Sequence, residues 1–198
     1  MNIDGDDKKI IDLYYFSDKV FTLKEIEKQS GCREGSLKEK RIKEIAKDME
    51  LNISIIKKVR GIFNRKTKDK KIIKEKSWKF DSFQSFYNWY KKEYEEGKGC
   101  CSYCGISEEV VRELVIQEIL KSARFPKNGK PARGRSRGLS LEVDRKKPEN
   151  GYESGNCALC CYFCNNDKSD VFTDVEYQEF FQNRSEYLRK LYNSKESK

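Results

Sequence analysis

Residues 139–170, LSLEVDRKKPENGYESGNCALCCYFCNNDKSD, predict a strand, a turn, a second strand and a helix in close succession. Apolar and polar residues alternate over 139–143, which indicates a half-buried strand with Glu142 and Asp144 on one face. Asn150-Gly151 is a hairpin signal, and a short apolar return strand follows it. A unit of this size buries too little apolar surface to be stable alone, which favours a metal cross-link.

Two Cys-x-x-Cys motifs can supply that cross-link, Cys101 with Cys104 and Cys161 with Cys164. Four thiolates that converge on one point provide the closed tetrahedral site that structural zinc prefers. A pair of disulfides, or buried free thiols, is the alternative. The other cysteines are expected to be dispensable as ligands: Cys32, Cys100, Cys157 and Cys160.

The segments LEVDR (141–145), GYESGN (151–156) and CYFCNNDKSD (161–170), with CSYCGISE (101–108) upstream, resemble the HNH, or ββα-metal, nucleases that carry a four-cysteine zinc site. Within that family the chain is most similar to PacI-type restriction endonucleases, in which Asp-Arg stands in place of Asp-His. The resemblance covers roughly residues 98–172. It implies a DNA endonuclease that hydrolyses phosphodiester bonds with a divalent metal.

Carried over position by position, the resemblance makes Asp144 and Asn165 the ligands of a catalytic Mg²⁺ or Mn²⁺. Arg145 stands where the family usually has a histidine base, Asn156 matches the asparagine that braces the hairpin, and Lys168 falls near the scissile phosphate. A guanidinium remains protonated at any ordinary pH, so Arg145 cannot accept a proton. Its expected role is to bind the scissile phosphate and stabilise charge in the transition state.

The general base is where the chain departs from PacI-type enzymes. The resemblance implies a tyrosine ahead of the active-site strand, and residues 134–138 hold serine and arginine instead. Tyr152 is the first replacement candidate, with packing of the hairpin as its alternative role. Glu142 is the next candidate, with support of the metal ligands as its alternative role. A metal-activated water without a dedicated side-chain base is the third possibility.

The composition favours a polyanionic partner. The 198 residues include 42 Lys and Arg against 33 Asp and Glu, a net charge of +9, which suits duplex DNA, with a solvated surface as the alternative. The absence of histidine removes the commonest general base and nitrogen ligand. The sequence shows no signal peptide and no apolar run of membrane-spanning length, and its eight cysteines favour a reducing compartment. We therefore expect a cytoplasmic protein without membrane association.

Residues 1–75 are expected to form a helical DNA-binding module ahead of a nuclease module at 76–198. Capping boxes at 22–25 and 36–39 predict two short helices that resemble a helix-turn-helix, and residues 53–66 are a candidate for the wing hairpin of a winged helix. Three helices packed only for structure are the alternative. The outer face of the later helix would present basic residues to DNA: Lys38, Lys40, Arg41, Lys43 and Lys47.

Two further segments are strongly basic. Between Lys57 and Lys79 there are eleven Lys or Arg and two acids, which indicates either a flexible linker or an arm that contacts phosphates. Residues 121–140 carry seven basic residues and no acid. This composition favours a DNA-tracking loop, with a solvated insertion as the alternative, and its candidate DNA contacts are Arg133, Arg135 and Arg137.

The expected fold class is therefore α+β and mainly helical, with a zinc-stapled ββα-metal nuclease module and an N-terminal helix-turn-helix or winged-helix-like module. The expected function is a sequence-specific double-stranded DNA endonuclease, most simply a type II restriction enzyme that acts as a homodimer. A homing or phage-type HNH nuclease is one alternative, and a non-catalytic zinc and helix-turn-helix regulator is another. Asp144, Arg145 and Asn165 discriminate against the regulator, which has no use for a hard-metal site.

Overall fold

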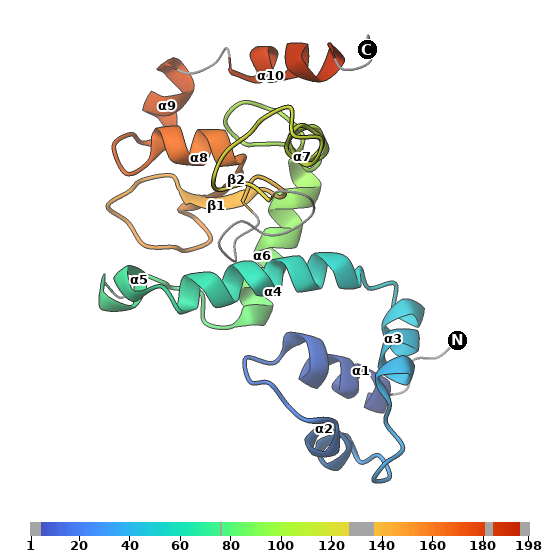
Figure 1. Ribbon diagram of the computed structural model, residues 1–198. Coiled ribbons are helices and arrows are strands. Elements are labelled where there is room, and N and C mark those ends of the chain that lie inside the picture. The colour runs from blue at the N-terminus through green and yellow to red at the C-terminus, as the bar shows by residue number, and fades with distance from the viewer. Residues whose placement is uncertain (1–4, 76, 127–136, 181–183, 195–198) are drawn as a thin grey trace. The chain divides into compact units, whose positions relative to one another are not determined.

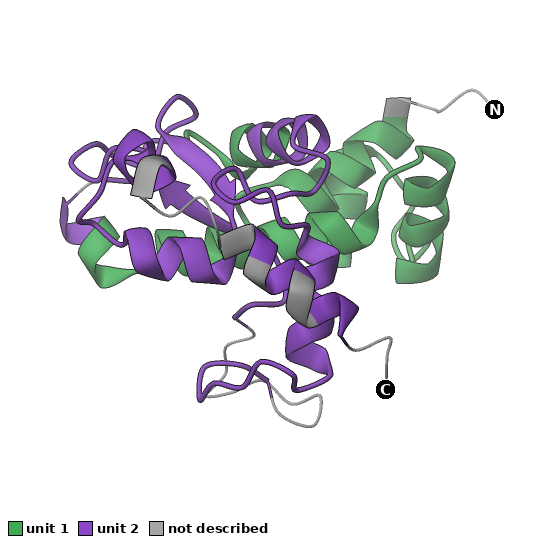
Figure 2. Ribbon diagram, turned by 90° about the horizontal axis from the view of Figure 1, so that it is seen from above, with its two compact units in different colours: residues 1–72, 80–88 green, residues 73–79, 89–198 purple. Residues whose placement is uncertain are grey.

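The computed structural model describes residues 5–75, 77–126, 137–180 and 184–194, and these are mostly helical (Figure 1). The contacts divide the chain into two compact units (Figure 2). The first contains residues 1–72 and 80–88, and the second contains residues 73–79 and 89–198. Within the described ranges, none of the helices has the length and apolar character needed to cross a membrane.

The first unit is a group of helices around an aliphatic core. In order they are α1 (Gly5–Ile11), a π-helical turn η1 (Asp12–Phe16), α2 (Leu23–Ser30), α3 (Glu39–Asp48), α4 (Ile53–Thr67) and the beginning of α5 (Lys70–Glu75). Helices α2 and α3 both contact α1. Apolar residues at helical spacing place one face of each helix in the core, where the buried side chains include Ile10, Ile26, Ile42, Ile45, Ile56 and Val59.

The expected wing hairpin is wrong, because residues 53–67 form the continuous helix α4. The side chain of Asn52 caps its first turn by accepting a hydrogen bond from the backbone N–H of Ile55 at 3.1 Å. The apolar residues then recur at intervals of three, a helical period, and the side chains of Ile56, Val59 and Ile62 are buried.

Of the two expected capping boxes, the one at 22–25 is confirmed by reciprocal side-chain and backbone hydrogen bonds. The box expected at 36–39 is wrong, because α3 begins at Glu39 without a side-chain cap. The carboxylate of Glu27 accepts the backbone N–H of Leu37 at 2.6 Å. The same carboxylate accepts the N–H of Gly35 at 3.0 Å, and Lys38 has an extended backbone, so the helix begins only at Glu39.

Helix α6 (Phe83–Glu96) carries a cluster of aromatic residues that pack in the protein core. Phe83 and Phe86 are buried in the first unit, and Tyr90 is buried in the second. Aromatic residues that are fully covered in this way contribute to core packing and are not available as platforms for base stacking.

The second unit contains the expected order of strand, strand and helix. Strand β1 (Glu142–Arg145) pairs antiparallel with β2 (Cys157–Cys160), and α8 (Tyr162–Lys168) follows at once and contacts β1 (Figure 1). The connection between the strands is longer than the expected Asn150-Gly151 turn. Within this connection the backbone N–H of Tyr152 donates to the Ser77 carbonyl at 2.6 Å. Tyr152 therefore pairs with a segment outside the hairpin and not with the opposite strand.

Three further helices complete the second unit: α7 (Glu108–Ile116), α9 (Asp174–Phe180) and α10 (Arg184–Asn193). Ser107 caps α7, with its hydroxyl accepting the N–H of Val110 at 3.3 Å. The helix ends at Ile116. Contacts between α7 and α10 join segments that are far apart in the sequence.

Candidate active site and metal centre

Four buried cysteines converge on one point in the second unit. Their sulfur atoms all lie within 4.8 Å of one another, and the Cys104 and Cys161 sulfurs are 3.9 Å apart. Zinc bound at about 2.3 Å to each sulfur of a tetrahedron places the sulfurs about 3.8 Å apart, so this donor set fits zinc. The four residues are those of the two Cys-x-x-Cys motifs: Cys101, Cys104, Cys161 and Cys164.

The two motifs meet because each is attached to the sheet. In the first motif, the backbone N–H and the hydroxyl of Ser102 both donate to the Leu159 carbonyl of β2, at 2.9 and 2.8 Å. In the second motif, Cys161 directly follows β2 and is the N-cap of α8, where its sulfur accepts the N–H of Cys164 at 3.5 Å. Hydrogen bonding, first with the Cys104 sulfur, lowers the pKa of the Cys101 thiol.

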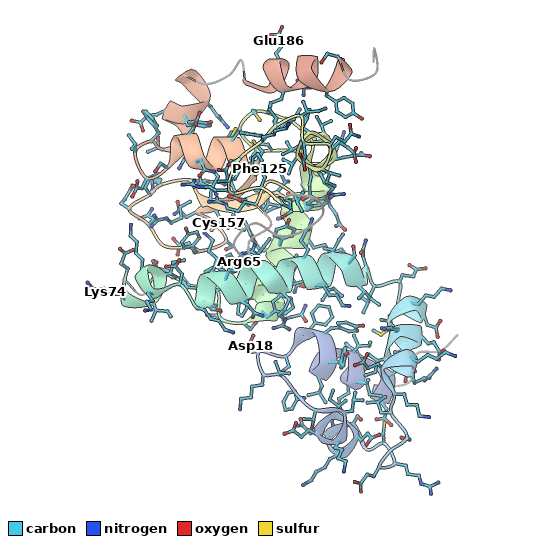
Figure 3. The ribbon with its side chains drawn as sticks, viewed as in Figure 1. Asp18, Arg65, Lys74, Phe125, Cys157 and Glu186 are labelled. Atoms are coloured by element: carbon cyan, nitrogen blue, oxygen red, sulfur yellow. The ribbon has the colours of Figure 1, made fainter. Side chains whose placement is uncertain are left out.

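The remaining cysteines lie outside this cluster. Cys157 and Cys160 are buried at the two ends of β2, and Figure 3 labels the first of them. Cys32 and Cys100 are partly exposed.

The acidic face of β1 contacts one face of α8. Glu142 and Asp144 are two residues apart on a strand and share a face, while Asn165 and Lys168 are three apart on a helix and also share a face. The Asn165 amide nitrogen donates to the Glu142 carboxylate, and the Lys168 ammonium lies 3.0 Å from Asp144 Oδ2. Two polar pairs therefore join the strand to the helix.

Asp144 is buried in a polar environment. Its carboxylate accepts a hydrogen bond from the Tyr103 hydroxyl at 2.6 Å and pairs with Lys168, which is fully buried. The Lys168 ammonium also donates to the Arg145 carbonyl at 2.7 Å. The structure thus places Lys168 against Asp144 itself. Burial, followed by the Asp144 charge, raises the pKa of Tyr103.

Tyr103 is the site residue that the sequence reasoning missed. It is one of the two spacer residues between Cys101 and Cys104, and nothing in that local pattern distinguishes it from an ordinary spacer. The sequence held no signal for it, because the hydrogen bond of the neighbouring Ser102 to β2, which brings Tyr103 to Asp144, is a tertiary contact.

Arg145 and Tyr152 lie together but apart from this cluster. Because side chains alternate along a strand, Arg145 points to the face opposite Asp144. Its guanidinium carbon is 5.2 Å from the centre of the Tyr152 ring, and its Nη1 donates to the Asn150 carbonyl at 3.4 Å. Tyr152 also packs against Trp78, with ring centres 5.9 Å apart.

Asn156 holds the connection between the strands. Its side-chain oxygen accepts the N–H of Lys147 at 3.0 Å, and its side-chain nitrogen donates to the carbonyls of Lys147 and Gly151, each at 3.0 Å. A buried side chain with three backbone partners fixes the loop that follows β1.

The basic candidates differ in what they contact. Arg137 forms two hydrogen bonds with the Glu142 carboxylate and lies 4.9 Å from the centre of the Tyr162 ring, and the bonds to Glu142 raise its pKa. Arg133 and Arg135 lie outside the described residues. The α3 candidates are all exposed: Lys38, Lys40, Arg41, Lys43 and Lys47.

The oxygen ligands proposed for a hard cation are the Asp144 carboxylate and the Asn165 amide oxygen. Both come from the β1 and α8 faces that meet, and oxygen donors are the type that Mg²⁺ and Mn²⁺ prefer. In residues 5–75, 77–126, 137–180 and 184–194, the four cysteines are the only group of three or more Cys, His, Asp or Glu whose ligand atoms converge.

Replacing Lys168 by glutamine is expected to destabilise the second unit by about 3–5 kcal/mol, because it leaves the buried Asp144 carboxylate without its cation. Urea unfolding followed by circular dichroism measures the change. Lys147→Gln is the control, since that exposed lysine is expected to change the unfolding free energy by less than about 0.5 kcal/mol. Equal stability of the two variants would show that the ion pair adds nothing to the fold.

Comparisons with known proteins complete the description of the site. No protein-family model matches the chain, and no curated protein matches it. A solved structure that it resembles is that of the rare-cutting HNH restriction endonuclease PacI, described for an extraordinary mechanism of DNA perturbation. The identity is 25%, the TM-score is 0.48, and the match covers 66% of this chain and 78% of that chain. The chain is therefore similar, at low identity, to an HNH nuclease structure over part of its length.

Proposed function

We propose that this chain is a metal-dependent DNA endonuclease of the ββα-metal class. The observation that carries the proposal is the meeting of Glu142 and Asp144 on β1 with Asn165 and Lys168 on α8. These contacts lie in the same small unit as the four-cysteine cluster. The HNH-like sequence motifs support the same conclusion. A regulator that only binds DNA would need the cysteines, but it would not need oxygen ligands for a hard cation at Asp144 and Asn165.

The proposed chemistry assigns a role to each side chain. Asp144 and Asn165 would hold Mg²⁺ or Mn²⁺, which supplies Lewis-acid stabilisation of the phosphate and activates water when bound. Lys168 balances the charge of Asp144, and the Tyr103 hydroxyl orients the same carboxylate. The Asn165 amide nitrogen donates a hydrogen bond to Glu142, which leaves the amide oxygen available to bind the metal.

The candidate bases have other partners. Glu142 is hydrogen-bonded to Arg137 and Asn165, which supports its role in orienting the metal ligand Asn165. Tyr152 packs against Trp78 and Arg145, which supports its role in holding the loop. No side chain is therefore proposed as the general base. Arg145 is proposed to bind a phosphate of the DNA strand.

The proposed biological role is a type II restriction enzyme that acts on duplex DNA. In this proposal residues 1–75 would bind DNA and residues 76–198 would cleave it, a division by function that differs from the two compact units at residues 73–75 and 80–88. One centre of this kind cuts one strand, so a homodimer on a twofold symmetric site is the simplest arrangement for a double-strand break. A homing or phage-type nuclease would use the same residues.

Supercoiled plasmid incubated with the full chain tests the proposal. Nicked and then linear DNA is expected with Mg²⁺ or Mn²⁺ and none without, and sequencing of the ends gives the cleavage position. Dilution is expected to increase the ratio of nicks to double-strand breaks, because monomers carry one centre. If the chain binds duplex DNA but leaves it intact with either metal, the regulator interpretation takes the place of this one.

A further inference from the structure

The charges on α4 all have one sign. Residues 53–68 contain six Lys or Arg and no acid. The next acid along the chain, Asp69, accepts the backbone N–H of Lys71 at 2.9 Å at the start of α5. Its carboxylate is thus used to begin a helix, and the charged residues of α4 itself are all basic.

By contrast, α3 carries both signs. Lys38 to Asp48 includes five basic residues and three exposed acids, Glu39, Glu44 and Asp48. One of its basic residues, Arg41, lies 3.5 Å from the Asp7 carboxylate. Mixed charges of this kind are typical of a solvated helix surface, and they weaken the attraction of α3 for a polyanion.

The faces of α4 separate cleanly into core and surface. Ile56, Val59 and Ile62 are buried on one side. Arg60 also turns inward, where its Nη2 donates to the Tyr15 carbonyl at 2.6 Å and its guanidinium carbon lies 3.4 Å from the centre of the Phe83 ring. Residues three or four apart on the opposite side form a stripe without acids: Ser54, Lys57, Gly61, Asn64, Arg65 and Lys68. Figure 3 labels Arg65 on this helix.

Gly61 stands in the middle of that stripe without a packing reason. A Cβ added there would meet nothing closer than the Arg65 guanidinium at 3.7 Å, an ordinary contact. Glycine in a helix interior loses more backbone entropy on folding than alanine, so it destabilises the helix. A residue without a side chain at the centre of a basic face allows another backbone to approach closely.

We infer that α4, and not α3, is the helix of the first unit that lies against duplex DNA, with Gly61 at the point of closest approach to the sugar-phosphate backbone. This inference rests on the proposed nuclease function, because it names the surface that would hold the DNA. The fifteen residues of α4 span about 22 Å, and the major groove of B-DNA accepts a helix. Lys57 and Lys68 contact phosphates, while Asn64 lies where a base edge is within reach.

Two matched double variants of the full chain test the assignment by fluorescence anisotropy with duplex DNA over a range of salt concentrations, without added Mg²⁺. Lys57→Gln/Lys68→Gln on α4 is expected to lower the slope of log affinity against log salt by about 1.8, since each lost phosphate contact removes about 0.9. Affinity is expected to fall at least about tenfold. Lys40→Gln/Lys43→Gln on α3 removes the same charge and is expected to leave the slope unchanged.

Gly61→Ala separates contact from stability. The alanine is expected to raise the Tm of the first unit by roughly 2–4 °C and yet weaken DNA binding severalfold. If the alanine variant binds like the parent, or if the α3 pair lowers the slope and the α4 pair does not, the inference fails and the nuclease proposal stands. If the parent shows no salt-dependent binding to duplex DNA, both fail together.

Discussion

Cys164→Ser is expected to unfold the second unit, which is the largest effect foreseen for a single substitution in this protein. The four sulfurs converge from segments 57 residues apart, so zinc joins the first motif to α8. Structural zinc contributes about 10–16 kcal/mol in small zinc-dependent peptides, which is as large as the whole stability of a typical domain. Circular dichroism and tryptophan fluorescence of the purified variant measure the loss.

Cys100→Ser is the matched control, because Cys100 adjoins the first motif but lies outside the cluster. Its sulfur lies 3.5 Å from the Lys98 carbonyl, a contact that a serine hydroxyl can also make. Metal analysis is expected to find about one zinc per chain in the parent and in this control. It is expected to find less zinc in Cys164→Ser. A folded, active Cys164→Ser chain that holds no zinc would contradict the structural role of the cluster.

Asp144→Asn is expected to reduce DNA cleavage by at least about 10³-fold, because it removes the charged ligand of the hard cation. The substitution has a second consequence. It leaves the fully buried Lys168 without an anion, which is expected to destabilise the unit by about 3–5 kcal/mol. A loss of cleavage by this variant alone would therefore not distinguish chemistry from folding.

The double variant Asp144→Asn/Lys168→Gln distinguishes a loss of catalysis from a loss of folding. It removes both charges, so it is expected to be more stable than Asp144→Asn and still inactive. Lys168→Gln alone keeps the carboxylate and is expected to retain measurable cleavage at low temperature. Asp167→Asn, an exposed position on the same helix, is the control for activity. If the double variant folds, binds duplex DNA and cuts it like the parent, Asp144 has no catalytic role.

Several elements could be predicted from the sequence because their signals lie within a few residues. The Thr22 capping box, the Ser107 cap and the β1–β2–α8 order follow from local hydrogen bonding and from side-chain period. Where the local signal was wrong, a contact from farther away was responsible. The 36–39 capping box does not form, since the Ser36 N–H that it needs donates to the Arg33 carbonyl at 3.0 Å and the helix begins only at Glu39.

The sequence by itself determined the soft-metal ligands and the acidic face of β1, because Cys-x-x-Cys spacing and strand alternation are short-range rules. Only the tertiary structure decided what Asp144 contacts. Tyr103 lies 41 residues before it in the chain, and Lys168 reaches it from α8. Both meet it because the first cysteine motif hydrogen-bonds β2 and because α8 contacts β1. No local pattern encodes that pairing, since it depends on how three separate segments pack.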